Sequence, residues 1–215
     1  VRSSAASDVY KRQLWDGKDY KNMSDQDEAK FRMIEYHKWK FKAKIFSPLA
    51  PLTVKRTPVL MTRVEYGFLG SYNKYKKSPF ETFYMGGDGM SGYSSTYATE
   101  TIGLRGYENG SIAGNGGYNS YGYAYSRLSM ELRYPFLLEP SSTIYGLVFV
   151  EAGNAWRDLK DFNPFQLKRS AGVGVRIFLP MIGLMGIDWA YGFDRPDGYD
   201  QRGGSNFHFI IGQEF

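Results

Sequence analysis

The sequence predicts an all-β protein, an antiparallel transmembrane β-barrel of which this chain supplies the C-terminal part with about seven strands. From about residue 34 onward, side chains alternate between a face without charges and a face rich in Lys, Arg, Asp and Glu, the period of two that strands impose. The alternating runs extend over about 10 to 14 residues, whereas globular strands cluster near five or six and tilted membrane strands need about 9 to 11. The connections alternate between short and long, as in bacterial outer-membrane barrels.

The N-terminal segment precedes the predicted barrel strands. Residues 1–13 begin without Met and show neither the apolar core of a signal peptide nor a clear period, so we expect a non-native or disordered leader. Residues 14–33 form an external loop in this interpretation, with a candidate short helix, because Ser24 followed by Asp27 resembles a capping box. Residues 34–215 are then the C-terminal portion of the membrane β-barrel domain.

The first two strands are predicted over residues 39–45 and 60–68. The first has lysines at every second position between aromatic and aliphatic residues, and the second has Arg63 and Glu65 in equivalent alternating positions. Aromatic and β-branched residues favour extended backbone, which supports the strand assignment. A short connection that contains proline, residues 47–53, joins the two runs.

The next two strands are predicted over residues 124–136 and 144–152, on either side of a short proline-containing connection at residues 138–142. The first alternates Arg and Glu with leucine, methionine and aromatic residues. The second opposes isoleucine and valines to Phe149 and Glu151. Each strand therefore has one face that carries no charge.

The last three strands are predicted over residues 171–179, 185–193 and 207–215. Glycines and single charged residues form one face of these runs, and aliphatic or aromatic residues form the other. A third short connection with proline, residues 180–183, joins the first two of them.

Short and long connections lie at opposite ends of the predicted strands. The long ones are rich in Gly, Tyr, Asp and Asn and lie at residues 71–80, 86–119, 157–166 and 195–206. Every short turn and the C-terminus then share one side of the membrane, which is the periplasmic side in bacterial barrels.

Aromatic residues gather at both strand ends, as in the interfacial girdles of such barrels. They are Phe46, Tyr134, Phe136, Phe178 and Phe215 at the short-turn end and Phe68, Trp156 and Phe193 at the other.

Seven strands do not make a complete membrane barrel. An open sheet edge in lipid leaves backbone N–H and C=O groups unpaired, and each costs several kcal/mol. Single-chain bacterial barrels also have an even number of strands, about eight or more. We therefore expect this chain to be part of a larger barrel, with the charged face lining its lumen.

Composition excludes several kinds of site. The 215 residues include no Cys, which excludes disulfides, thiolate metal sites and cysteine nucleophiles. The net charge of +5 comes largely from Lys and Arg that alternate with apolar residues, so we expect no nucleic-acid partner. The histidines, His37 and His208, lie on distant predicted strands with no Ser or Asp convincingly beside them. We expect no enzyme activity, no metal and no cofactor.

The longest connection, residues 86–119, contains the sequence IGLRGY at residues 102–107. A glycine-rich loop is entropically costly to order, and a guanidinium can fix it by bidentate bonding to a carboxylate. Glu151 shares its predicted inward orientation with Phe149, so a loop folded into the lumen places Arg105 against Glu151 and over the Phe149 ring. From the residues alone, a solvent-exposed loop arginine is the alternative.

Four segments resemble the bacterial surface antigen family of outer-membrane protein assembly factors, the BamA type. They are residues 102–107, the lead-in FETFYMGG at 80–87, the strand FVEAGNAW at 149–156 and the terminal FHFIIGQEF at 207–215. The order and spacing of the segments are those of the family. The resemblance covers about residues 34–215 and implies a barrel of about sixteen strands.

The resemblance also implies roles for individual residues. Arg105, Gly106 and Tyr107 form the loop motif, with its acceptor on the barrel wall at Phe149 and Glu151, where the family usually has Asp in place of Glu. The terminal strand closes the barrel weakly against the first strand, so that the seam opens and templates incoming strands. The residues of this terminal strand and seam are Phe207, Phe209, Ile211, Gly212 and Phe215.

We therefore expect an outer-membrane β-barrel assembly factor that folds and inserts outer-membrane proteins through a soft barrel seam. Its partners are then the lipid bilayer of the outer membrane, unfolded outer-membrane protein clients and accessory lipoproteins, and its C-terminus lies on the periplasmic side. Two alternatives stay open at this point. One is a related outer-membrane translocator of the two-partner secretion type, and the other is a passive porin-like channel.

Overall fold

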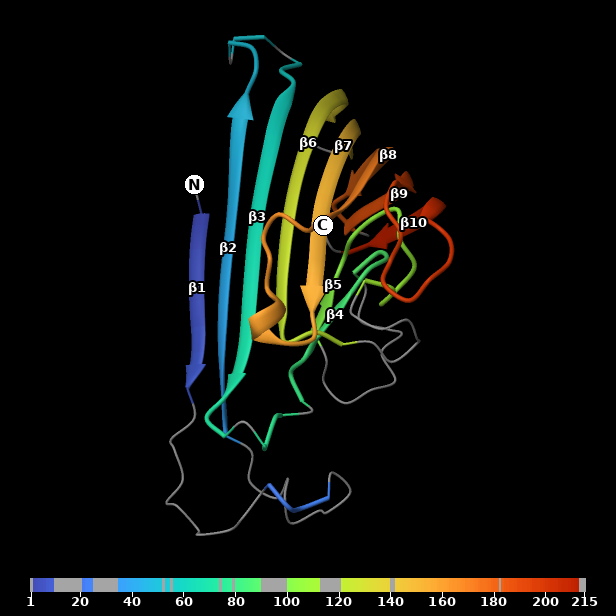
Figure 1. The fold of residues 1–215 in the computed structure, drawn as a ribbon. Helices are drawn as coiled ribbons and strands as arrows, with labels where there is room; N and C mark the ends of the chain where they lie inside the picture. The colour runs from blue at the N-terminus through green and yellow to red at the C-terminus, as the bar shows by residue number, and fades with distance from the viewer. Residues whose placement is uncertain are drawn as a thin grey trace.

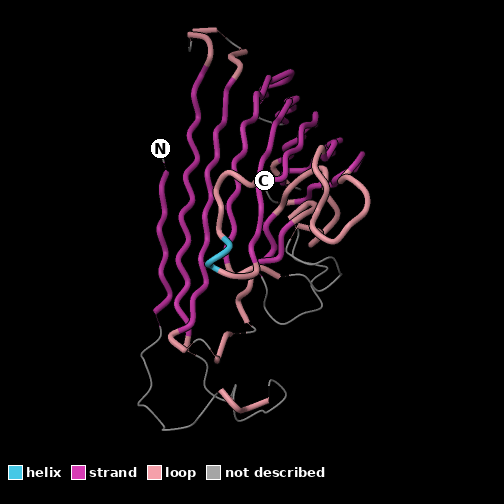
Figure 2. Tube along the Cα trace, viewed as in Figure 1, coloured by secondary structure: helices cyan, strands magenta, loops and turns pink. Residues whose placement is uncertain are grey.

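The computed structural model describes residues 2–9, 21–24, 35–51, 53–54, 56–73, 75–78, 80–89, 100–112, 121–139, 142–181 and 183–212. Eight antiparallel strands form one curved sheet in the order β1-β2-β3-β6-β7-β8-β9-β10, and β4 and β5 form a short parallel pair beside it (Figure 1). Strands make up most of the described trace (Figure 2). The strands of the large sheet are β1 Arg2–Val9, β2 Tyr36–Pro48, β3 Val59–Ser71, β6 Ala124–Glu139, β7 Ser142–Trp156, β8 Lys168–Leu179, β9 Gly183–Gly192 and β10 Gly204–Ile211. The other elements are β4 Phe83–Met85, β5 Glu100–Ile102 and the short 3₁₀ helix η2 Leu159–Asp161.

The predicted all-β class and antiparallel arrangement are confirmed. The seven predicted strands correspond in order to β2, β3, β6, β7, β8, β9 and β10. Six of them run longer than their predicted ranges, since β2 and β3 have 13 residues each, β6 has 16, β7 has 15, β8 has 12 and β9 has 10. The pairing of β6 with β7 is irregular between Pro135 and Leu137, because proline has no N–H to donate to the ladder.

The N-terminal segment differs in part from the leader predicted over residues 1–13. Arg2–Val9 forms β1, whose backbone pairs with β2 in a register that sets Arg2 opposite Lys44. An edge strand forms its hydrogen bonds through the backbone, so this pairing does not require the alternating side chains that the segment lacks. The candidate helix after Ser24 falls outside the described residues.

The convex face of the sheet exposes apolar side chains. Val148, Val150 and Ile187 are each more than half exposed, at 56, 53 and 52%. A protein solvated by water on all sides buries such residues, whereas a barrel wall presents them to lipid. Other exposed members of this face are Trp39, Phe41, Ile45, Met130, Leu132, Val173, Val175, Trp189, Phe207 and Phe209.

The concave face buries charged side chains instead. Arg63 and Glu131 are 1% exposed, and Asp188 is fully buried. Charged side chains are almost never buried to this degree unless they are paired. The sheet is therefore polar inside and apolar outside, which is the arrangement that the sequence predicts for a lumen and a lipid-facing surface.

The connections place one long segment inside the curve of the sheet. The short connections join β2 to β3, β6 to β7 and β8 to β9, and β10 finishes at the same end, where the Gly212 N–H donates to the Leu184 carbonyl (2.7 Å). The segment between β3 and β6 carries β4 and β5 along the concave side (Figure 1). An apolar cluster fixes it there, formed by Leu69, Phe83, Met85, Ile102, Leu104, Tyr107, Ile112, Tyr123, Tyr125 and Ala155. Within the described ranges, no helix has the length and apolar character needed to span a membrane.

The close approach of this segment to the wall depends on Gly153 of β7. A Cβ atom at this position would lie 2.4 Å from Met85 Cε and 3.3 Å from the Leu104 side chain. The segment around β4 and β5 therefore packs directly on the backbone of β7, and this contact sets the position of the residues that follow β5.

Candidate functional site

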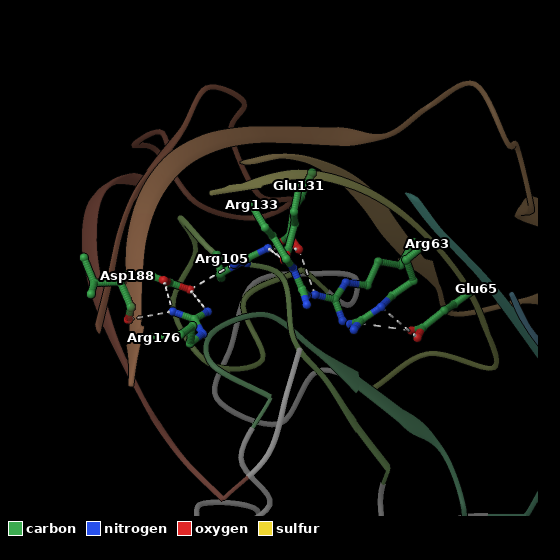
Figure 3. Close-up of polar contacts among 10 residues, drawn as sticks. Arg63, Glu65, Arg105, Glu131, Arg133, Arg176 and Asp188 are labelled. Atoms are coloured by element: carbon green, nitrogen blue, oxygen red, sulfur yellow. Dashed lines mark hydrogen bonds and ion pairs between the residues drawn. The ribbon is translucent and has the colours of Figure 1, made fainter. Parts of the chain in front are cut away.

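Arg105 is the centre of a buried ion-pair network on the concave face of the sheet (Figure 3). It lies in the turn after β5, and its side chain is fully buried. Its Nη1 atom donates to Asp188 Oδ2 (2.9 Å), and its Nη2 atom donates to Glu131 Oε1 (2.5 Å) and Glu151 Oε1 (2.8 Å). The three carboxylates come from β9, β6 and β7, so one side chain connects the loop to three strands.

Glu151 and Phe149 of β7 both contact Arg105. The Arg105 backbone N–H donates to Glu151 Oε2 (3.0 Å), so each oxygen of this carboxylate binds the loop. The Arg105 Cζ atom lies 3.4 Å from the centroid of the Phe149 ring, in a cation–π contact. The ion pair and the ring contact that the sequence predicts are both present, and Arg105 is not the solvent-exposed arginine of the alternative.

Each of the three carboxylates also binds an arginine of the barrel wall. Removing charges from water is costly, and mutual attraction offsets that cost only where the geometry is good and the remaining donors and acceptors are paired. Sharing each carboxylate between two guanidinium groups supplies this attraction at hydrogen-bonding distance. The wall pairs are Arg127–Glu151 at 2.8 Å, Arg133–Glu131 at 2.7 Å and Arg176–Asp188 at 2.5 Å.

The charge state of Arg105 follows from these neighbours. Burial by itself would lower the pKa of the guanidinium, but the negative charges of Glu151, Glu131 and Asp188 outweigh burial and raise the pKa above its ordinary value. Arg105 is therefore permanently cationic, and the loop is held by charge-assisted hydrogen bonds at any physiological pH.

Gly106 allows the chain to reach the wall beside Arg105. Its φ is 87°, in the left-handed region that favours glycine. A Cβ atom would lie 2.9 Å from both the Gly192 nitrogen and the Ser170 Cβ. Its N–H donates to His208 Nε2 of β10 (2.9 Å). Both the backbone conformation and the available space therefore require glycine here.

Tyr107 completes the attachment of the loop. Its ring is fully buried, and its hydroxyl donates to the Arg169 carbonyl (2.6 Å) and accepts from the Asp194 N–H (3.3 Å). Burial raises the pKa of Tyr107 to about 12, so the hydroxyl stays protonated and able to donate. The three residues of the motif thus bind different partners: a charged cluster, the last strand and the backbone near the outer ends of β8 and β9.

Comparison with known proteins agrees with this geometry. The family model described as the Omp85 superfamily domain matches residues 29–215. The chain belongs to the Omp85 superfamily. Among solved structures, this Omp85 chain is similar to the crystal structure of BamA from Haemophilus ducreyi lacking POTRA domains 1–3, with a TM-score of 0.55 and 21% sequence identity. That match covers 81% of this chain and 34% of the BamA chain, and no curated protein matches the sequence.

Omp85 membership and the shared fold confirm the predicted resemblance to a BamA-type C-terminal barrel. They also place the chain in the outer membrane, in a superfamily concerned with insertion or translocation of proteins there. This Omp85 chain spans 34% of the similar BamA chain.

The predicted seam residues of this Omp85 barrel lie on β10 or just beyond it. Phe207, Phe209 and Ile211 point outward and are 67, 59 and 67% exposed, so none of them joins the buried network. The sequence predicts a strand through residue 215, but β10 ends at Ile211, because Gly212 has a φ of 74° that interrupts extended backbone. Phe215 lies outside the described residues.

The sequence does not single out three partners of the Omp85 loop motif: Glu131, Asp188 and His208. The signal that could have found them is orientation, since the period of two puts all three on the charged face of their strands. Orientation alone leaves open the height of each residue along the barrel. That height depends on strand register, which sets His208 opposite Asp188 and Ser129 opposite Glu151.

The converging carboxylates of this Omp85 site bind a guanidinium. Three acidic side chains around one point could also attract a cation, but here the Arg105 nitrogens lie 2.5–2.9 Å from them. Within the described part of the chain, no group of three or more His, Cys, Asp or Glu residues is arranged to hold a metal ion.

Proposed function

We propose that this chain is the C-terminal barrel portion of a BamA-type assembly factor, which folds and inserts outer-membrane β-barrel proteins. The observation that carries the proposal is the Arg-Gly-Tyr loop motif, buried inside the curve of the sheet with Arg105 bound to three wall carboxylates. A passive channel needs no such loop attachment. A long loop fixed in the lumen instead supports a barrel wall whose closing strand is weakly held.

The shape of the terminal strand supports the same function. β10 has eight residues, against 15 in β7, and within the described residues it pairs with β9 alone. In the seam that the resemblance implies, this strand closes the barrel against the first strand, and when the seam opens an incoming strand can bind its edge by β-augmentation. In this mechanism the protein performs no covalent chemistry and needs no cofactor, because each added backbone hydrogen bond lowers the free energy of the client.

The partners follow from this mechanism. The exposed apolar face binds the lipid bilayer, and the edge of β10 binds unfolded outer-membrane protein clients. The three short connections and the end of β10 share one end of the sheet, which supports a periplasmic C-terminus. We include accessory lipoproteins among the proposed partners on the basis of the BamA-type resemblance.

The decisive experiment replaces Arg105 in the full-length protein and measures outer-membrane protein assembly. Arg105→Ala should lower the levels of folded outer-membrane proteins, and Arg105→Lys should restore them only in part, because lysine keeps the charge but lacks the bidentate geometry. Arg202→Ala, at an exposed arginine of the β9–β10 connection, is the matched control. Heat-modifiable migration of the protein itself shows whether each variant forms a barrel.

The same strains distinguish the alternatives. Unchanged levels of outer-membrane proteins in Arg105→Ala would overturn the proposal. Co-purification of a single dedicated exported protein would instead identify a translocator. Steady single-channel conductance with no effect on client folding would identify a passive channel.

A further inference from the structure

One hydrogen bond joins the loop motif to the last strand. His208 Nε2 accepts from the Gly106 N–H at 2.9 Å, and the His208 side chain is buried on the inner face of β10. In the pairing of β9 with β10, His208 lies directly opposite Asp188, which binds Arg105. Arg105 and Gly106 are adjacent in the loop, and they therefore bind two residues that lie opposite each other on β9 and β10, Asp188 and His208.

The loop tip also packs tightly where β10 begins. Gly192 ends β9 and Gly203 precedes β10, and a Cβ atom on either would lie 2.3 or 2.5 Å from the Gly106 carbonyl oxygen. A Cβ atom on Gly203 would also lie 2.6 Å from the Tyr107 ring. The loop thus contacts the last strand both at its start and, through His208, at its middle.

These contacts contrast with the rest of β10. Phe207, Phe209 and Ile211 point outward to lipid, and the Asn206 side chain donates to carbonyls of its own turn. Ile210 is buried on the inner face, but its side chain is apolar and forms no hydrogen bond. On the described strand, His208 is the inward side chain that binds the loop motif by a hydrogen bond.

We propose that His208 is a positioning residue that couples the docked loop to the terminal strand, so that releasing the Gly106–His208 bond loosens both together. The proposal rests on the assembly function above, since it names the contact through which the loop controls the seam. With the bond intact, β10 is held on its inner face as well as by β9. Without it, β10 keeps its pairing with β9, the packing of the loop tip at Gly203 and the buried Ile210 side chain, but loses its hydrogen bond to the loop motif.

The chemistry of imidazole gives this coupling a distinctive signature. A neutral imidazole has one acceptor nitrogen, whereas a protonated one donates from both nitrogens and cannot accept from the Gly106 N–H. The charged groups near His208 are Asp188 of β9, Glu151 of β7, Asp88 after β4 and Arg105 of the loop. Glutamine at position 208 would keep an acceptor oxygen at every pH, and alanine would have none.

Hydrogen–deuterium exchange on the full-length protein in lipid bilayers tests the coupling. Protection factors are compared for residues 100–112 and 204–212, which removes the direct effect of pH on exchange chemistry. At about pH 8, His208→Ala should lower protection of both segments about tenfold, and His208→Gln should keep it near wild type. As the pH is lowered from about 8, the wild type should lose protection in both segments at a higher pH than His208→Gln does.

Two results would overturn the coupling. One is that His208→Ala loosens residues 204–212 while residues 100–112 keep their protection. The other is that the wild type and His208→Gln respond identically to pH, a comparison that needs no alanine variant to fold. His37→Gln, at a histidine on β2, is the matched control for loss of an imidazole.

The assembly assay separates this proposal from the proposed function. If Arg105→Ala impairs client assembly while His208→Ala leaves both segments protected, the coupling is wrong and the assembly function stands. If Arg105→Ala leaves assembly unchanged, the assembly function is wrong. In that case joint loosening of the two segments would still show the physical link between loop and strand.

Discussion

Glu151→Gln should release the loop from the barrel wall. Glu151 accepts three hydrogen bonds, from the Arg105 N–H, Arg105 Nη2 and Arg127 Nη2, at 3.0, 2.8 and 2.8 Å. Glutamine retains one acceptor oxygen, and its NH₂ group faces donors that it cannot satisfy. The substitution also removes a negative charge that two guanidinium groups share.

The free-energy cost of Glu151→Gln follows from the burial of the ion pair. Glu151 and Arg105 side chains are both fully buried, so water cannot replace the lost carboxylate. Breaking such a pair by removing one partner costs about 3–5 kcal/mol. Glu131 and Asp188 still bind Arg105, so we expect the lower half of this range, equivalent to about a hundredfold or greater shift toward the undocked loop.

The assay combines urea titration of heat-modifiable migration with protease cleavage of the loop in folded protein. Glu151→Gln should unfold at lower urea and become cleavable between β5 and β6, while Glu139→Gln, at an exposed glutamate, should behave as wild type. Glu151→Asp should fall between them, because one methylene less lengthens the contacts but keeps the charge. A Glu151→Gln barrel with the wild-type urea midpoint and an uncleaved loop would refute the reasoning. Glu131 and Asp188 would then be sufficient to hold Arg105 and keep the loop docked.

Three further outcomes are expected. Tyr107→Phe keeps the buried ring but loses hydrogen bonds to the Arg169 carbonyl and from the Asp194 N–H, so loop docking should weaken by about 1–3 kcal/mol in the same cleavage assay. Val150→Arg puts a charge on the lipid face and should destabilise the barrel by about 2–4 kcal/mol in urea titration in bilayers, whereas Val150→Ala should cost less. The hydrogen bonds from Arg169 lower the pKa of Asp194, so this contact should stabilise the fold above the ordinary carboxyl pKa of about 3.9 and be lost as pH falls through the lowered value. Asp194→Asn should remove that part of the acid dependence, and an unchanged acid unfolding profile would contradict it.

The strands and their faces could be predicted because lipid and lumen select opposite side chains. Val148 and Val150 point outward, Phe149 and Glu151 point inward, and each position obeys the period of two. The contact between Arg105 and Glu151 could be predicted for the same reason, because the loop motif identified one arginine. Its acceptor had to lie on an inward-facing position of the wall.

The rest of the site depends on relations between strands that one sequence does not encode locally. Glu131 and Asp188 meet at Arg105 because β6, β7, β8 and β9 pair in particular registers. The Gly106–His208 bond requires the loop to cross the lumen to the last strand, which no local periodicity specifies. β1 pairs with β2 through its backbone, and the sequence of residues 2–9 has no alternating pattern that would have signalled a strand.

Each carboxylate that binds Arg105 also has a cationic partner on the wall. Glu151, Glu131 and Asp188 pair with Arg127, Arg133 and Arg176, so Arg105 is a second cation for each of them. When the loop leaves, every carboxylate therefore keeps one guanidinium partner, and no buried anion is stranded. The electrostatic cost of undocking the loop therefore falls on Arg105 and not on the wall.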